Sequence, residues 1–237
     1  AIANTTHSDL GYRPEMNQIL VCPANAIIDF TLRCLVNPGE EVILPDPGFP
    51  TYYSAIAYNN IIPVRVPLKE KNNFQMDPLD IRERITEKTR LIIINSPHNP
   101  TGAVMNSEFI REIYKIAEEF DLFLLSDEVY SKLIYDKSHH SPTIFDKCIK
   151  RTILLNSLSK MYAMSGWRLG YAIGPQHFIE KMGLLVQTIL SCLPEFSQRG
   201  GIAALTGGQT YLHEMVRIFK KRRDLLVEGL NSINGIR

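Results

Sequence analysis

Short runs of Ile, Val and Leu alternate with amphipathic stretches between residues 41 and 168. Continuous apolar runs of this length are typical of strands that are buried on both faces of a parallel sheet, and the amphipathic stretches are typical of crossover helices. The pattern therefore predicts an α/β fold in which a mostly parallel sheet carries helices on both faces. The predicted strands are residues 42–44, 62–66, 91–94, 122–125, 152–156 and 169–173.

Helices are predicted where apolar residues recur at helical spacing. One lies between two predicted strands, and Ser107 is placed as its N-cap. After residue 175 the pattern changes from alternation to long helices. The predicted helices are residues 27–35, 107–120, 177–192, 196–205 and 211–230.

The two ends of the chain bear on its domain organisation. The chain opens without a methionine and stops just after a helix, so we expect a fragment or an incomplete chain. Its final helix is too long to belong to one compact domain. We therefore expect residues 1–210 to form a large domain, and residues 211–237 to be an interdomain helix that leads into an absent small C-terminal domain.

Composition excludes several classes of partner. Lys and Arg number 26 against 25 Asp and Glu, and their scatter along the chain predicts no nucleic-acid surface. The 4 cysteines lie beside apolar residues, as small core residues do, and form no C-x-x-C pair, which favours a reducing compartment and no structural metal. No segment approaches the ~20 apolar residues that span a bilayer, so we expect no membrane contact and a cytoplasmic protein.

The strongest chemical signal is the segment SLSKMYAMSGWRLG at residues 157–170, which directly follows a predicted buried strand. Lys160 can form an imine with an aldehyde. Ser157 and Ser159 can donate hydrogen bonds to phosphate oxygens, and Arg168 can pair with a phosphate in a bidentate fork. A lysine by itself is usually a surface charge, but this combination indicates a site for a phosphorylated aldehyde cofactor.

A second segment, SDEVY at residues 126–130, ends another predicted strand. Asp127 would lie at the carboxyl end of a parallel strand, where open α/β sheets bind ligands. It can keep a pyridine nitrogen protonated, and the phenol of Tyr130 can donate to a ring oxygen of the same cofactor. A helix cap explains Asp127 equally well if the segment is taken alone, and Glu128 is expected to be structural.

Three loops complete the pattern. In NSPHNPTG, residues 95–102, two prolines and a glycine would hold a rigid turn that aims the amide of Asn99 at the cofactor's ring oxygen, whereas His98 is expected to be a solvated loop residue. An ordinary polar turn remains the alternative. In PDPGFPTY, residues 45–52, an aromatic side chain can stack on a pyridine ring, with Phe49 the first candidate and Tyr52 the second.

The third loop is the weakest signal. Residues 21–26 lead into a predicted helix, and backbone N–H groups at a helix N-terminus can bind a phosphate. Ala24 and Asn25 are the candidates.

In this order and at these spacings, the motifs resemble those of the class I and II aminotransferases, of the fold type I family that depends on pyridoxal 5'-phosphate. The features P-x-P-G-F and N-x-P-H-N-P-x-G resemble the branch that contains tyrosine and alanine aminotransferases. The resemblance covers residues 11–237. It implies a homodimeric enzyme that moves an amino group between an L-amino acid and a 2-oxo acid through a Schiff base on Lys160.

The resemblance also implies roles for single residues. Catalysis would depend on Lys160, Asp127 and Tyr130. The implied cofactor-binding residues are Lys160, Asp127, Tyr130, Asn99, Phe49, Ser157, Ser159, Arg168, Ala24 and Asn25.

The chain departs from the family in two ways. Residues 23–25 read Pro-Ala-Asn where the family has a Gly-Ser or Gly-Ala pair, which puts phosphate binding by this loop in question. Family members are also nearly twice this length, so the resemblance implies a missing N-terminal segment before residue 1 and a missing small C-terminal domain after residue 237. In the family, that small domain supplies the arginine that binds the substrate carboxylate.

Other functions remain open at this point. A β-elimination lyase acting on sulfur amino acids or an aminocyclopropane carboxylate synthase would use the same lysine, aspartate, tyrosine and arginine. A non-catalytic regulator could keep the fold, although the intact Lys160, Asp127 and Arg168 argue against it. A plain nucleotide-binding domain is disfavoured, because the chain has neither a G-x-G-x-x-G after a strand nor a G-x-x-x-x-G-K-[ST].

Overall fold

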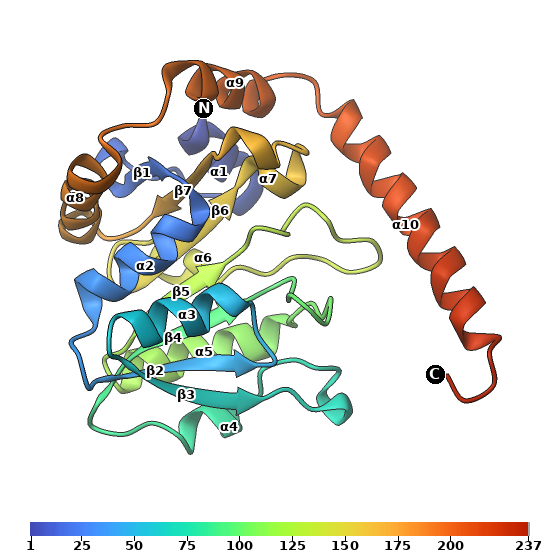
Figure 1. The fold of residues 1–237 in the computed structure, drawn as a ribbon, viewed down its shortest axis with the longest axis horizontal. Coiled ribbons are helices and arrows are strands. Elements are labelled where there is room, and N and C mark those ends of the chain that lie inside the picture. The colour runs from blue at the N-terminus through green and yellow to red at the C-terminus, as the bar shows by residue number, and fades with distance from the viewer. Residues whose placement is uncertain (237) are drawn as a thin grey trace.

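The computed structural model describes residues 1–236, which form a seven-stranded sheet with helices on both faces (Figure 1). The strand order is β1-β7-β6-β5-β4-β2-β3. Neighbours among β2 to β6 pair in parallel, whereas β7 is antiparallel to both β1 and β6. The predicted mostly parallel α/β fold is confirmed. The strands are β1 Ile19–Cys22, β2 Glu41–Asp46, β3 Ile62–Pro67, β4 Thr89–Asn95, β5 Phe123–Asp127, β6 Thr152–Ser157 and β7 Gly170–Ile173.

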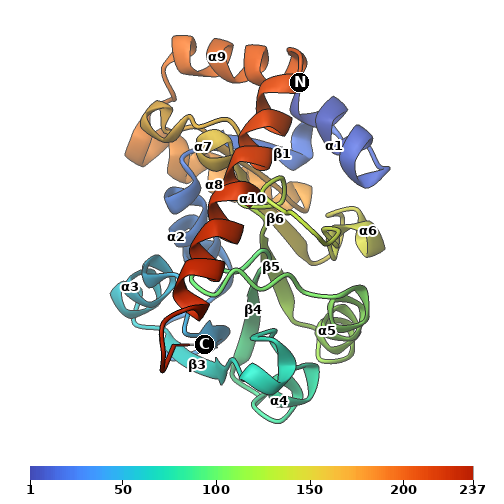
Figure 2. The same ribbon diagram turned by 90° about the vertical axis from the view of Figure 1, so that its right-hand side faces the viewer.

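Two layers of helices cover the sheet (Figure 2). On one face lie α2 Ala24–Leu35, α3 Pro50–Tyr58 and α8 Gln176–Leu185, and on the other lie α1 Ile2–Leu10, α4 Pro78–Arg82, α5 Ser107–Glu119 and α6 Thr143–Asp146.

Residues that alternate along a strand enter two separate apolar clusters. Leu91 and Ile93 of β4 pack in the cluster that includes α2, whereas Ile92 and Ile94 pack in the cluster that includes α5. Successive side chains of a strand point to opposite faces, so a strand covered on both faces needs apolar residues throughout. This burial explains the uninterrupted apolar runs in the sequence.

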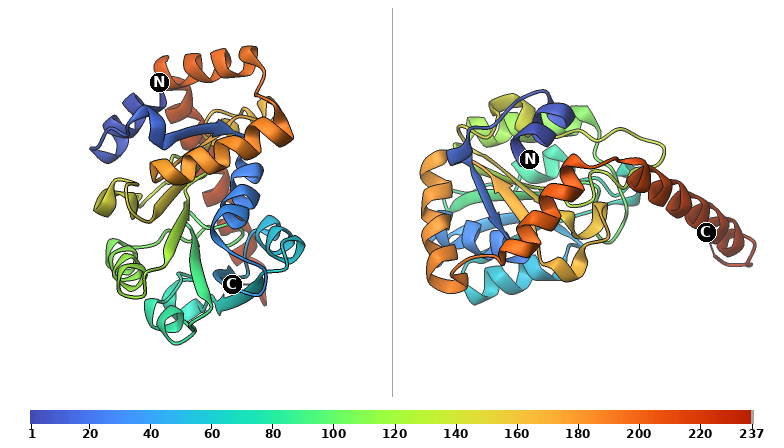
Figure 3. Two further views of the ribbon diagram at one scale, coloured as in Figure 1. Left: turned by 90° about the vertical axis from the view of Figure 1, so that its left-hand side faces the viewer. Right: turned by 90° about the horizontal axis from the view of Figure 1, so that it is seen from above.

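The C-terminal part is helical, as predicted. After α8 come a π-helical stretch at Val186–Leu190, α9 Glu195–Thr206 and α10 Thr210–Asn231. The short helix α7 Leu158–Met161 lies between β6 and β7, and 3₁₀ helices lie at Met16–Gln18, Glu70–Asn72 and Ser165–Trp167. Helix α10 extends away from the sheet (Figures 1 and 3). In residues 1–236, no helix is long and apolar enough to cross a membrane.

Several local predictions are wrong. The edge strand β1 was missed because it lies before the alternating region that starts at residue 41, and its pairing with β7 cannot be read from its own sequence. Helix α2 begins at Ala24, three residues before the predicted start at residue 27. The N-cap of α5 is Asn106, not Ser107, because the Asn106 side chain accepts a 2.7 Å hydrogen bond from the Phe109 N–H.

Two expectations about burial also fail. His98 is not solvated: it is only 6% exposed, and its Nδ1 lies 2.8 Å from Thr101 Oγ1 within the same turn. Burial lowers the pKa of His98 to about 4, so the side chain is neutral near pH 7 and serves to brace the turn. Cys192 is exposed, unlike the buried Cys22 and Cys148, because it lies in the loop that follows the π-helical stretch.

Candidate active site

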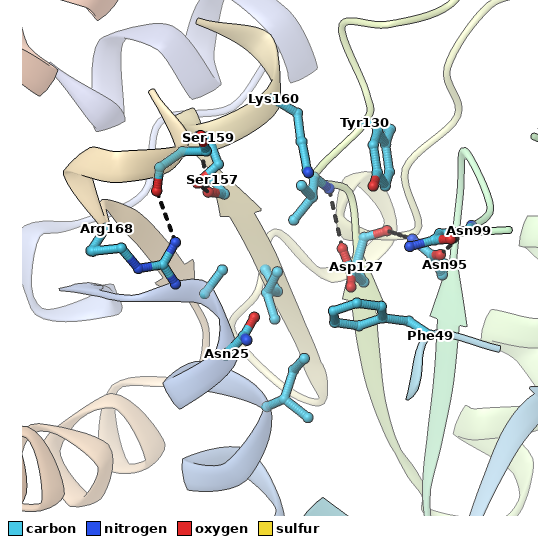
Figure 4. Close-up of a pocket in the computed structure, with 15 residues that line it drawn as sticks. Asn25, Phe49, Asn95, Asn99, Asp127, Tyr130, Ser157, Ser159, Lys160 and Arg168 are labelled. Carbon is cyan, nitrogen blue, oxygen red and sulfur yellow. Dashed lines mark hydrogen bonds between the residues drawn. The ribbon is translucent and has the colours of Figure 1, made fainter. Parts of the chain in front are cut away.

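A cavity of about 210 Å³ opens where the carboxyl ends of β4, β5 and β6 meet the N-terminus of α2 (Figure 4). This is where open α/β sheets bind ligands. All ten residues predicted from the sequence as cofactor contacts line this cavity, although they come from five separate segments. Its lining consists of Ala24, Asn25, Ile28, Phe49, Asn95, Asn99, Asp127, Val129, Tyr130, Leu155, Ser157, Ser159, Lys160, Ser165 and Arg168.

Lys160 enters the cavity from the short helix α7. The Ser157 side chain caps this helix by accepting from the Ser159 N–H, so the chain turns as soon as β6 ends. The Lys160 ammonium lies 5.9 Å from the centre of the Tyr130 ring, and its side chain is directed toward Asp127 and Tyr130 (Figure 4). Lys160 has no carboxylate partner within the described chain, so its amine is available to a ligand.

Asp127 is the buried carboxylate of the site, only 5% exposed. Its Oδ2 accepts a 2.5 Å hydrogen bond from the Tyr52 hydroxyl, and its Oδ1 accepts from the Val129 N–H at 3.2 Å. Burial raises the pKa of Asp127 to about 6, despite these hydrogen bonds. The carboxylate is therefore charged at neutral pH and incompletely compensated, which suits a cationic ligand group.

The prediction of Tyr52 as the second residue that could stack on a ring is wrong. Its side chain is fully buried beneath the cavity, where its hydroxyl is committed to Asp127. Phe49 does line the cavity, with its ring edge-on to Tyr52 at 5.6 Å, and Figure 4 shows it beside Asp127. The contact between Phe49 and Tyr52 could be expected from the sequence, because residues three apart at the start of a helix lie on the same side.

Asn95 is a site residue that the sequence reasoning did not single out. It is the last residue of β4, and its amide donates to the Asp127 carbonyl at 3.0 Å. Its Oδ1 accepts from the Asn99 N–H at 2.8 Å. Asn95 therefore fastens the turn that carries Asn99 to the strand that carries Asp127. The sequence signal was its position at the carboxyl end of a buried strand.

The opposite end of the cavity suits an anion. Ser157, Ser159, Arg168 and Asn25 lie together there, away from Lys160 and Asp127 (Figure 4). The hydroxyl oxygens of Ser157 and Ser159 are 2.9 Å apart. The N-terminus of α2 adds backbone N–H groups without intrahelical partners and the positive end of a helix dipole.

The Pro-Ala-Asn sequence does not remove this anion site. Pro23 is the N-cap of α2, and Ala24 and Asn25, the first two helical residues, line the cavity. Ala24 and Asn25 thus place the N-terminus of α2 at this end of the cavity even without a Gly-Ser pair.

The sequence profile described as "Aminotransferase class I and II" matches residues 3–237, and the chain belongs to this family. It is 40% identical to a probable aspartate aminotransferase of Methanocaldococcus jannaschii over 98% of this chain and 62% of that protein. It is 41% identical to an LL-diaminopimelate aminotransferase of Halothermothrix orenii over 84% of this chain and 52% of that protein.

Solved structures show the same fold. An aromatic aminotransferase from Pyrococcus horikoshii has a TM-score of 0.94 and 35% identity, over 98% of this chain and 64% of that one. The chain thus spans less than two thirds of the length of these relatives.

This family uses pyridoxal 5'-phosphate. The residues present fit that cofactor, because the cavity offers a different donor set to each of its groups. The Lys160 amine suits the aldehyde, a buried carboxylate with a raised pKa suits the pyridine nitrogen, and hydroxyls, a guanidinium and a helix N-terminus suit the phosphate.

A single glycine allows α2 to approach the sheet closely at this anion site. A Cβ on Gly170 would lie 2.9 Å from the Asn156 carbonyl oxygen and 3.0 Å from the Ala24 nitrogen, and backbone atoms cannot move aside as a flexible side chain can. We expect Gly170→Ala to lower the free energy of unfolding by about 1–3 kcal/mol, the usual cost of overpacking. We also expect it to weaken binding of pyridoxal phosphate, because Ala24 is displaced.

Thermal unfolding and a cofactor titration check this prediction. Gly183→Ala is the matched control, since Gly183 lies within α8 and a Cβ there meets no atom within 4 Å. The control is expected to leave stability unchanged or to raise it by up to about 1 kcal/mol. Equal stability of the two variants would contradict the close approach of α2 to β7 at Gly170.

Proposed function

We propose that the full-length protein is an aminotransferase that moves an amino group between an L-amino acid and a 2-oxo acid. The observation that carries the proposal is one cavity in which the Lys160 amine faces the buried Asp127 carboxylate, with an anion site at the far end. The family and the names of the relatives support the same activity. When bound, pyridoxal phosphate supplies an electron sink and a carrier for the amino group.

At the ring end of the cavity, Lys160 would hold the cofactor through its aldehyde, and its amine would be the group that accepts and returns a proton at the substrate α carbon. Asp127 would keep the pyridine nitrogen protonated. Tyr130 and Asn99 would donate to the ring oxygen, and Phe49 would cover one face of the ring.

At the anion end, the proposed phosphate ligands combine charge with hydrogen-bond donors. Arg168 supplies the charge, and the α2 N-terminus adds N–H groups. Binding at both ends would orient the ring, with Lys160 and Asp127 at one end and the phosphate ligands at the other. The proposed phosphate ligands are Ser157, Ser159, Arg168, Ala24 and Asn25.

The raised pKa of Asp127 predicts how cofactor affinity depends on pH. The carboxyl group is charged above its pKa of about 6 and neutral below it, and only the charged form attracts a protonated pyridine. Affinity for pyridoxal phosphate is therefore expected to fall about tenfold between pH 7 and pH 5 from this group alone. A fluorescence titration of the cofactor at several pH values measures this change.

Asp127→Asn is the control for this titration, because the phosphate of the cofactor also titrates near pH 6 and its contribution is common to both proteins. In the variant, the pH dependence of affinity is expected to lose only the contribution of Asp127 and to keep that of the phosphate. The same pH dependence in both proteins would contradict the prediction.

A half-reaction distinguishes an aminotransferase from a lyase on the same scaffold. An aminotransferase given an amino acid alone converts its cofactor stably to the amine form and releases one equivalent of 2-oxo acid. A β-elimination lyase regenerates the aldehyde form and keeps turning over. Loss of the visible absorbance band of the full-length protein without further turnover would support transamination, and continuous product release would contradict it.

Three further features belong to this proposal. We propose that the enzyme is a homodimer, as the resemblance implies. We propose that residues 1–210 are the cofactor-binding large domain and that 211–237 lead to a small domain, in line with the projection of α10 from the sheet. We also propose a cytoplasmic location, because the four cysteines are free thiols.

A further inference from the structure

Glu128 directly follows Asp127, but its side chain lies outside the cofactor cavity. It is 2% exposed and lines a second, smaller cavity behind β5. Its Oε1 accepts hydrogen bonds from Ser126 Oγ at 2.9 Å and from Ser141 Oγ at 2.5 Å, and its Oε2 lies 2.6 Å from His139 Nε2. We call these four side chains the Glu128 network. Both oxygens of this buried carboxylate are hydrogen-bonded, and because hydrogen bonds are directional they fix the positions of the partner side chains.

The partners of Glu128 lie at the two ends of one long loop. Residues 129–142 leave the end of β5, extend toward α10 and return to α6 without forming a helix or strand (Figure 1). At the outgoing end, the Ser131 N–H donates to the Glu128 carbonyl at 2.9 Å. At the returning end, His139 and Ser141 bind the Glu128 side chain. Glu128 therefore contacts both ends of the loop, and Asn156 and Asp9 add contacts to Ser131 and Lys132 at the outgoing end.

Tyr130 lies within this base. It is the second residue of the loop, and its ring lies in the cofactor cavity near Lys160. The return of the loop at His139 limits how far the outgoing residues can move from β5. The side chain of His139 is 13% exposed, and its Nδ1 is buried without a hydrogen-bond partner, so Nε2 and Glu128 carry its polar interaction.

We propose that Glu128, His139 and Ser141 are positioning residues that hold the base of the 129–142 loop closed and thereby keep the Tyr130 phenol at the ring end of the cofactor cavity. This inference rests on the proposed function, because the cavity is taken to bind pyridoxal phosphate. It adds to that function a set of residues that touch neither cofactor nor substrate.

Two replacements of His139 in the full-length protein test the hydrogen bond itself. His139→Ala removes the partner of a buried carboxylate, and we expect amide hydrogen exchange across residues 129–141 to become faster by on the order of tenfold. The dissociation constant of pyridoxal phosphate is expected to rise by a similar factor. His139→Gln keeps an N–H donor at about the same reach, so it is expected to restore both quantities to near the wild-type values.

The neighbouring His140 provides the matched control. It is half-buried in the same loop and makes no hydrogen bond or ion pair within the described residues, so His140→Ala is expected to change neither quantity. Ser141→Ala is a milder second variant in case His139→Ala does not fold. It removes a 2.5 Å hydrogen bond to the same carboxylate and is expected to act in the same direction.

The outcomes separate the inference from the function on which it rests. Unchanged exchange in His139→Ala, or equal effects of alanine and glutamine, would overturn the proposed hydrogen-bonded closure. Faster exchange with an unchanged cofactor dissociation constant would overturn the link to Tyr130. If the wild-type protein bound no pyridoxal phosphate, the proposed function would fall, whereas the exchange of the cofactor-free protein would still decide whether the network holds the loop.

Discussion

Replacing Lys160 with alanine in the full-length protein is expected to lower the rate of transamination by on the order of 10⁴-fold, the upper range for loss of a positioned general acid and base. The loss should appear in kcat more than in KM, because Lys160 acts in the transition state of proton transfer. The rest of the cavity would still bind the cofactor phosphate. Steady-state kinetics with an amino acid and a 2-oxo acid measure the loss.

The design of this test includes a second lysine variant. Lys150 is exposed, follows the short helix α6 and does not line the cavity, so Lys150→Ala should retain wild-type kinetics. Substantial activity in Lys160→Ala would show that another group moves the proton, and the proposed mechanism would be wrong.

The second large effect is expected from Asp127→Asn. The asparagine keeps the size of the side chain and can still accept from Tyr52, but it removes the buried negative charge opposite the pyridine nitrogen. Breaking one partner of a buried ion pair costs about 3–5 kcal/mol, which corresponds to a loss of roughly 10²- to 10⁴-fold in kcat/KM. Stopped-flow measurement of the half-reaction would report it.

Asp121, just before the same strand, offers a control for this substitution. It precedes β5 at the end far from the cavity, and its side chain is 97% exposed, so Asp121→Asn is expected to change activity by less than twofold. A comparable loss in both variants would indicate that the aspartates act through stability and not through the cofactor.

The fold was predictable because strands covered on both faces leave an uninterrupted apolar signature, as Ile92, Ile93 and Ile94 of β4 show. The edge strand β1 is also apolar throughout, from Ile19 to Cys22, but it lies before the region of β/α alternation, and its place in the sheet depends on pairing with β7. Local propensity cannot report a partner that lies about 150 residues away in the chain.

The sequence was sufficient to predict which residues line the cavity, because each motif directly follows or precedes an element that the apolar pattern reveals. The sequence did not predict the hydrogen bonds that hold these lining residues in place. Tyr52 beneath Asp127, Asn95 between two strands and Glu128 behind the site all depend on contacts between distant segments. His98 was misjudged for the same reason, because burial of a loop residue depends on what packs over it.

The measurement that tests the central claim most directly is borohydride reduction of the full-length protein with pyridoxal phosphate, followed by peptide mapping of the reduced adduct. The account predicts a visible absorbance band that borohydride abolishes, with the cofactor attached at Lys160 and at no other lysine in comparable yield. An adduct that maps elsewhere, or the absence of any band in the full-length protein, would contradict the assignment of Lys160 and favour a non-catalytic protein that keeps the fold.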